Sequence, residues 1–360
     1  MPFIFPALNN ADAGDGRQRV PITVLTGFLG SGKTTLLNRL LRQPDMHGTA
    51  VVINEFGAIG LDHDLVDHTN EHMVLLANGC ICCTVRGDLV EAFERLAQSP
   101  EAQRRELRHV VVETTGLADP APILHTLMGD PRLARHWRLA GVACTIDAFN
   151  AMATLGQHRE AVKQAAVADR LLLTKTDLVR AEARAPVLAR LRAINPLADV
   201  SEGPAAALAS LLALLDHAPT TQAPVPQGEG RSYFFPVAAP ASGTASQHDD
   251  HIRSHVIVRD TPLSREGVMA WLDMVSAMRG DDLLRVKGIV HLADDPEHPM
   301  VIHGVQHLFH PPETLARWPS EDRRTRIVFI TRNIAAEDIE ATLSVFERRR
   351  QRSAHPAPPV

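Results

Sequence analysis

Residues 27–34 read Gly-Phe-Leu-Gly-Ser-Gly-Lys-Thr, which satisfies the pattern G-x-x-x-x-G-K-[ST]. The pattern lies between an apolar, β-branched run, VPITVLT ending at Thr26, and a helix-forming stretch, TLLNRLLRQ. A strand before this pattern and a helix after it are the context that identifies a phosphate-binding P-loop. The sequence therefore predicts an α/β fold with a phosphate site after its first strand.

The residue types of this segment suit phosphate binding. Glycines let backbone N–H groups wrap around phosphate oxygens, and the helix N-terminus adds partial positive charge. We expect Lys33 to reach the β- and γ-phosphates and the Thr34 hydroxyl to bind Mg²⁺. A glycine-rich turn without a ligand is the alternative, and the complete strand–loop–helix order argues against it. The expected nucleotide contacts here are Gly27, Gly30, Ser31, Gly32, Lys33, Thr34 and Thr35.

Four more apolar runs alternate with helical stretches in the first two-thirds of the chain. Such unbroken aliphatic runs are typical of strands that are buried on both faces, and their alternation with helices predicts a mostly parallel sheet. The loops after parallel strands open on the carboxyl edge of the sheet, where ligands bind. The runs are TAVVIN ending at Asn54, HVVVE ending at Glu113, GVACTID ending at Asp147 and RLLLTK ending at Lys175.

Residues 174–177, Thr-Lys-Thr-Asp, close the last of these strands and match the tetrad [N/T]-K-x-D that recognises guanine in P-loop GTPases. The Asp177 carboxylate can accept hydrogen bonds from guanine N1–H and from the exocyclic amine. Adenine offers neither donor and would leave the carboxylate desolvated and unpaired. Lys175 would lie along the base, and Thr174 stands where Asn is commoner. We expect GTP as the nucleotide; an ordinary surface turn is the alternative.

Glu113 ends its strand and is followed by Thr-Thr-Gly at 114–116. A carboxylate there is placed like a Walker-B acid, which holds Mg²⁺ through water or positions the attacking water, and the Gly116 backbone can approach the γ-phosphate as a switch. We expect catalytic roles for Lys33, Glu113 and Gly116. An ordinary strand-end acid is the alternative for Glu113. No arginine is obviously aimed at the γ-phosphate, so we expect slow intrinsic hydrolysis.

Three of the four cysteines crowd into the segment Gly79-Cys80-Ile81-Cys82-Cys83. Thiolates are soft ligands that suit Zn²⁺ or Cu(I). Three thiolates cannot fill a four-thiolate site, so Glu55 or a nearby histidine has to complete tetrahedral coordination. Such an adjustable shell suits a metal carrier; buried small hydrophobic residues are the alternative. We expect the fourth cysteine, Cys144, to be packed inside its strand.

The composition limits the class of protein. The formal charge of −5 gives no footprint for nucleic acid or for an anionic membrane. The first residues lack the pattern of a signal peptide, and no apolar run approaches the roughly 20 residues of a membrane span. The clustered cysteines cannot cross-link distant parts of a fold, so we expect a reducing compartment, the cytoplasm.

A second unit follows a stretch rich in Pro, Ala, Gly and Ser. Its periodicities predict a small α+β domain of order βαβββα, with strands SHVIVRD, LLRVKGIVHLA, MVIHGVQHLF and TRIVFITRN. Helix faces are predicted by Val268, Leu272 and Val275, and by Ile339, Leu343 and Phe346. The expected segments are a disordered tail at 1–18, a P-loop GTPase domain at 19–215, a linker at 216–250, the α+β domain at 251–351 and a disordered tail at 352–360.

The motifs GFLGSGKTTLLN, INEFG, GCICCTV, ETTGLADP and TKTD, in this order, resemble the CobW family of metal-handling P-loop GTPases, whose nearest relatives are UreG and HypB. The RVKG at 285–288, the HGVQ stretch and Trp318 resemble the C-terminal domain of that family. The resemblance implies GTP and Mg²⁺ as cofactors and a zinc or cobalt site. That site would be coupled to GTP by the loop bearing Asn54, Glu55 and Gly57. Its implied ligands are Cys80, Cys82, Cys83 and Glu55.

The chain departs from the family pattern in two places. Ala58 follows NEFG where many relatives have an acidic residue, which removes one possible oxygen ligand. A long histidine-rich run before the C-terminal domain is reduced to His248, Asp249, Asp250, His251 and His255, and we expect these to be mainly a solvated polar stretch. We expect the histidines of the second unit to be structural or merely exposed. These are His291, His303, His307 and His310.

The resemblance implies a GTP-hydrolysing metallochaperone that delivers zinc, or cobalt, to client metalloproteins. The sequence is also compatible with a dimer that forms in the presence of nucleotide or metal. One alternative is a GTP-dependent interaction switch that gates maturation of a metalloenzyme such as nitrile hydratase or a cobalamin-pathway enzyme, with the metal regulatory. A second is a P-loop kinase for a small molecule, against which TKTD and Cys-x-Cys-Cys both argue.

Overall fold

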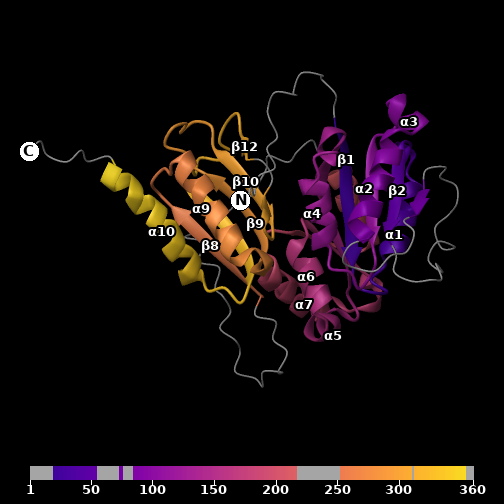
Figure 1. Ribbon diagram of the computed structural model, residues 1–360. Coiled ribbons are helices and arrows are strands. Elements are labelled where there is room, and N and C mark those ends of the chain that lie inside the picture. Colours follow the sequence, from indigo (N-terminus) through magenta and orange to yellow (C-terminus); the bar gives the residue numbers. More distant parts are fainter. Residues whose placement is uncertain (1–18, 55–72, 76–83, 217–251, 310–311, 354–360) are drawn as a thin grey trace, which may run out of the picture. The chain divides into compact units, whose positions relative to one another are not determined.

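The computed structural model describes residues 19–54, 73–75, 84–216, 252–309 and 312–353 (Figure 1). Contacts divide them into two compact units, one formed by residues 19–216 and the other by residues 252–353. Within these ranges no helix is long and apolar enough to cross a membrane. The tail expected at 1–18 and most of the expected linker lie outside the described residues. At the other end, the last helix runs to Ser353.

The first unit is built on a seven-stranded sheet of order β3-β2-β4-β1-β5-β6-β7. Every strand pair in it is parallel. The predicted α/β fold is confirmed, and each of the five predicted strands is present. The strands are β1 (Val20–Gly27), β2 (Thr49–Asn54), β3 (Met73–Leu75), β4 (His109–Thr114), β5 (Trp137–Asp147), β6 (Arg170–Thr174) and β7 (Asp199–Glu202).

Two strands, β3 and β7, were not expected from the sequence. β7 reads Asp-Val-Ser-Glu and is an edge strand that pairs only with β6, so it needs no apolar run. β3 has three residues and pairs with β2 at the opposite edge. β7 therefore lacks the buried-strand pattern, and β3, although its Met-Val-Leu is apolar, is shorter than a typical strand.

Helices cover both faces of this sheet. On one face α1 and α8 bury an apolar cluster that contains Leu37, Leu40 and Leu211. The connection from β1 to β2 runs in one direction along the sheet, and the connections β4→β5, β5→β6 and β6→β7 run in the opposite direction. Because such connections are right-handed, the helices of these three connections lie on the other face of the sheet. The helices are α1 (Lys33–Leu41), α2 (Thr84–Ala97), α3 (Pro100–Gln103), α4 (Ala121–Gly129), α5 (Ala151–Gln157), α6 (Arg159–Val167), α7 (Ala181–Ile194) and α8 (Pro204–Asp216).

The direction of the crossovers reverses between β1 and β4. These strands are neighbours, with Leu25 opposite Glu113 in the register, yet α1 and α4 leave them toward opposite faces of the sheet. Such a switch point leaves a crevice at the carboxyl ends of the two strands, which is where open α/β sheets bind ligands. The P-loop and residues 113–116 lie there.

The second unit is an antiparallel sheet of order β11-β10-β9-β13-β8, with β12 paired to β10. The expected α+β domain is thus confirmed. MVIHGVQHLF was expected to be one strand, and this was wrong: Gln306, with φ of 53°, turns the chain between β10 and β11. The elements are β8 (Ile252–Arg259), α9 (Arg265–Arg279), β9 (Leu283–Val290), β10 (Met300–Val305), β11 (Leu308–Phe309), β12 (Glu313–Thr314), β13 (Thr325–Arg332) and α10 (Ala336–Ser353).

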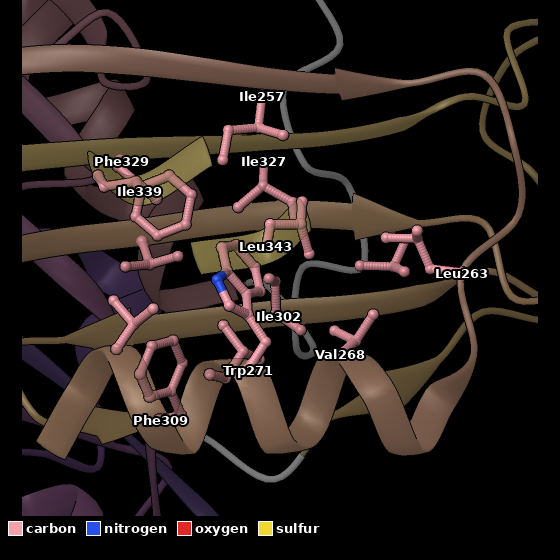
Figure 2. Close-up of a cluster of buried hydrophobic side chains, with 14 of the residues drawn as sticks. Ile257, Leu263, Val268, Trp271, Ile302, Phe309, Ile327, Phe329, Ile339 and Leu343 are labelled. Carbon is pink, nitrogen blue, oxygen red and sulfur yellow. The ribbon is translucent and has the colours of Figure 1, made fainter. Parts of the chain in front are cut away.

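The core of this unit lies between the sheet and its two helices (Figure 2). Trp271 of α9 packs edge-on against Phe329 of β13, with ring centroids 5.7 Å apart. Its indole N–H donates to the Thr342 hydroxyl of α10 at 2.9 Å, so one side chain ties both helices to the sheet. A second, smaller cluster contains Ile289 and Val301, with Trp318 packed against it.

Candidate nucleotide site

The P-loop begins at Gly27, the last residue of β1, which has a φ of 143°. A Cβ at this position would lie 2.3 Å from Thr145 Oγ1 and 2.7 Å from Ser31 Oγ. Those two hydroxyls are hydrogen-bonded to each other at 2.6 Å, beneath the loop. Only glycine fits such a close backbone approach, so the first glycine of the motif is required by packing against β5 as well as by phosphate access.

Lys33 is the first residue of α1 and is buried. Its ammonium donates to the carbonyl oxygens of Gly27 at 2.9 Å and Phe28 at 3.3 Å. The charge is therefore held over the concave side of the loop. Gly32, at the helix N-cap, has a left-handed φ of 93°, and Gly30 has a φ of 67°. Thr35 is exposed in the first turn of α1.

Thr34 and Glu113 meet at the switch point between β1 and β4. The Thr34 hydroxyl donates to Glu113 Oε1 at 3.1 Å, and the Glu113 side chain is buried. A hydroxyl and a carboxylate are the hard oxygen donors that Mg²⁺ accepts, so the residues present fit this ion. Bound with a nucleotide, Mg²⁺ would be held by Thr34 and Glu113 and would neutralise phosphate charge.

Thr174 connects residues 174–177, the candidate base-recognition segment, to the P-loop. Its hydroxyl lies 2.7 Å from the carbonyl oxygen of Ser31 and 3.1 Å from that of Ile146. The threonine that replaces the commoner asparagine therefore makes a direct link between the two loops.

Lys175 takes the left-handed conformation, with φ of 52°, and its side chain turns back to β5. The ammonium lies 2.9 Å from Asp147 Oδ2. Asp147 also accepts the Asn150 side-chain amide at 2.9 Å and the Phe149 backbone N–H at 2.9 Å. Although burial raises the pKa of Asp147, these hydrogen bonds and the charge of Lys175 hold that pKa below its usual range. Asp147 is therefore a carboxylate that fixes the position of Lys175.

Sequence reasoning had placed Asp147 at the end of a strand and given it no role. Replacing it with asparagine is expected to weaken binding of GTP and GDP alike, by about 10-fold, the value of one hydrogen bond between charged groups. The hydrolysis rate at saturating GTP should stay within about twofold, because we expect Lys175 to contact the base and not the reacting phosphate. Fluorescent-GDP titration measures the first quantity and phosphate release the second.

The control for this prediction is Asn150→Ala, which removes one bond to Asp147 and leaves the pair with Lys175 in place. In a Lys175→Met background Asp147→Asn should cause no further loss, since interacting residues are not additive. Additive losses in the double variant would show that Asp147 acts without Lys175.

Asp177 lies in a short 3₁₀ turn, Thr176–Leu178, directly after Lys175, and is exposed. The loop after β7 comes close to the same turn. A Cβ on Gly203 would stand 3.2 Å from Thr176 Oγ1. The TKTD segment and this loop thus lie together at the carboxyl ends of β6 and β7, beside the P-loop.

The candidate metal ligands Cys80, Cys82, Cys83 and Glu55 lie outside the described residues, as do His310 and residues 248–251. In the described part of the chain, no cluster of three or more His, Cys, Asp or Glu side chains could hold a metal ion. Cys144 is fully buried, and burial raises the pKa of its thiol to about 12, so it stays protonated.

His255 and His291 of the second unit have structural partners. His255 Nε2 lies 3.0 Å from the Ile334 carbonyl oxygen, and burial lowers the pKa of its ring. The ring of His291 packs edge-on against Trp318 at 5.4 Å.

Models of known protein families match both units of the chain. The family model for the nucleotide-binding domain of CobW, HypB and UreG matches residues 21–202, and the model for the C-terminal domain of the cobalamin synthesis protein CobW matches residues 252–347. The chain belongs to the CobW family.

Relatives of this CobW-family protein include the zinc chaperone YjiA of Escherichia coli K12. It is 31% identical over 326 residues, which cover 90% of this chain and 98% of the relative. The zinc-regulated GTPase metalloprotein activator 1 of Schizosaccharomyces pombe is 36% identical over 204 residues, 55% of this chain and 49% of the relative. The crystal structure of Zn(II)-bound YjiA GTPase from E. coli aligns with a TM-score of 0.67 at 25% identity, over 92% of this chain and 99% of that one.

Proposed function

We propose that this CobW-family GTPase is a metallochaperone that binds zinc, with cobalt as the alternative cargo, at Cys80, Cys82 and Cys83. It passes the metal to client metalloproteins in the cytoplasm under the control of GTP. Relatives that are named zinc chaperone and zinc-regulated GTPase metalloprotein activator support zinc as the metal and delivery to clients as the role. The nucleotide site described above supports the GTP control.

The observation that carries this proposal is the topology of the elements on either side of the candidate metal segment. β3 is parallel to β2 and ends at Leu75, and α2 begins at Thr84, the residue after Cys83. Strand-to-helix connections in such sheets lie at the edge where the P-loop lies. Glu55 directly follows Asn54, which pairs in register with Thr114 of β4, next to the candidate switch residue Gly116. GTP bound at the P-loop and metal bound at the cysteines would thus share one edge.

In this mechanism different residues bind the phosphates, recognise the base and respond to the γ-phosphate. Lys33 and the P-loop amides bind and orient the phosphates, and Thr174, Lys175 and Asp177 select guanine. Glu113, together with Thr34, would hold Mg²⁺ at the phosphates. The Gly116 backbone senses the γ-phosphate. The order of loops then allows the Glu55 segment to follow the state of the nucleotide, so that GTP tightens the metal site and hydrolysis loosens it.

The test is zinc affinity in two nucleotide states, measured by competition with a chromogenic chelator. With a non-hydrolysable GTP analogue, zinc should bind about 5–150-fold more tightly than with GDP, the usual range for coupled sites, and zinc must tighten GTP by the same factor. The variant with Cys80, Cys82 and Cys83 replaced by serine should lose the tight site. Cys144→Ser is the matched control and should keep it.

Equal zinc affinity in both nucleotide states would refute the carrier mechanism, even if hydrolysis and zinc binding were each present. A client complex that forms with GTP and without metal would instead point to the interaction switch.

A further inference from the structure

Helix α6 holds the segment that follows β4. The side chain of Gln164 is completely buried in α6. Its amide nitrogen donates to the carbonyl oxygens of Gly116 at 3.2 Å and Ala118 at 3.0 Å. One residue earlier, the Lys163 ammonium lies 2.8 Å from Asp119 Oδ2. Two consecutive residues of α6 thus hold three positions of the loop after Glu113.

The same helix also contacts the P-loop. The ring of His158, at the N-cap of α6, stacks on Phe28 with centroids 4.4 Å apart. Gly116 in turn lies against the P-loop backbone, because a Cβ on it would stand 2.7 Å from Leu29 N and 2.8 Å from Leu29 Cα. Neither of those atoms can move aside without moving the P-loop itself. Gly116 is therefore held between the P-loop on one side and Gln164 on the other.

The contribution of Gln164 is the hydrogen bonds that its amide N–H groups donate. Both of its hydrogen-bond partners are carbonyl oxygens, which fixes the orientation of the amide. Its own Oε1 is buried and has no hydrogen-bond partner among the residues described. A buried acceptor without a partner is destabilising, and a methionine of similar length would avoid that penalty. The amide therefore contributes two hydrogen bonds to the loop that simple space filling would not require.

Those hydrogen bonds act on Gly116, the glycine of the loop. Glycine is conformationally permissive, so the peptide planes around Gly116 would otherwise sample several orientations. Fixing the Gly116 and Ala118 carbonyl groups toward α6 limits rotation at Gly116 before any ligand binds. Preorganised backbone donors stabilise phosphate charge better than donors that must first be ordered.

We propose that Gln164 is a positioning residue that presets the Gly116 backbone for the γ-phosphate of GTP. This rests on the role proposed above for Gly116. Because GDP has no γ-phosphate, loss of the Gln164 hydrogen bonds weakens the binding of GTP and slows its hydrolysis, and leaves GDP binding unchanged.

The test compares nucleotide affinities of the full chain with Gln164→Met. We expect binding of a non-hydrolysable GTP analogue to weaken about 10-fold, the effect of losing one to two neutral hydrogen bonds. GDP affinity should stay within about twofold, and kcat should fall about 10-fold. Gln103→Met is the matched control: it makes the same change on an exposed glutamine of α3, and both affinities should stay at the wild-type value.

Equal loss of GDP and analogue binding would overturn the proposal, since a residue that only supports the fold affects both nucleotides alike. So would unchanged analogue binding. If Gln164→Met does not fold, Gln164→Leu removes the same two donors with a smaller apolar side chain that suits a completely buried position. The same selective loss is expected, and its absence overturns the proposal. These assays contain no zinc, so their outcome can be interpreted even if the proposed metal-carrier mechanism is refuted.

Discussion

Replacing Lys33 with alanine is expected to reduce GTP hydrolysis to background, a loss of at least roughly 100-fold, as for removal of one preorganised donor in other enzymes. Lys33 is the cation that the P-loop holds over its concave side, and its ammonium is already fixed by the carbonyl oxygens of Gly27 and Phe28. Without it, negative charge that develops between the β- and γ-phosphates has no partner on α1. Phosphate release measures the effect.

The fold should survive this change. Lys33 is the first residue of α1, and the apolar face of that helix, including Leu36 and Leu37, does not involve it. Circular dichroism should therefore match the wild type. Arg39→Ala, which removes an exposed cation from the last turn of the same helix, is the control and should keep full turnover. Substantial turnover in Lys33→Ala would place the catalytic site elsewhere.

The parts of the candidate nucleotide site that could be predicted from the sequence are local in the chain. The P-loop is one continuous segment, and its glycines carry left-handed or otherwise unusual φ values that a motif can reveal. Glu113 could be placed beside Thr34 because both follow buried strands of a parallel sheet, whose carboxyl ends share one edge. The sequence did not give the strand order, and the distance between the Thr34 and Glu113 side chains follows only once β1 and β4 are known to be neighbours.

Asp147 and Gln164 could not be found in this way. Asp147 meets Lys175 across 28 residues of sequence, and Gln164 meets Gly116 across 48. Neither belongs to a motif, because what each contributes depends on tertiary packing: the β5–β6 register in one case and the docking of α6 in the other. A strand-end acid on the carboxyl edge was a visible signal for Asp147. A glutamine within a helix gave no signal for Gln164.

The final prediction concerns guanine selectivity. Replacing Asp177 with asparagine is expected to weaken GTP binding about 100-fold, since the one hydrogen bond that is lost, from the exocyclic amine to a charged acceptor, is worth about 1.5–3 kcal/mol. Xanthosine triphosphate should become the preferred nucleotide. Its 2-oxo group accepts a hydrogen bond from the new amide where guanine would present a second donor, while its N1–H still pairs with the amide oxygen. Titration with fluorescent guanine and xanthine nucleotides measures the exchange.

The structure indicates that Asp177→Asn leaves the rest of the nucleotide site in place. Asp177 is exposed in the short turn after Lys175, whereas Thr174 and Lys175 are held by Ser31 and Asp147. The P-loop and its lysine should therefore stay in place, and Asp177→Asn with xanthosine triphosphate should regain hydrolysis close to that of the wild type with GTP. Glu182→Gln, the same change on an exposed acid in the first turn of α7, should leave selectivity unaltered. Equal affinity of the wild type for ATP and GTP would remove the basis of this prediction, because a carboxylate facing the base edge leaves adenine without a partner and guanine with two.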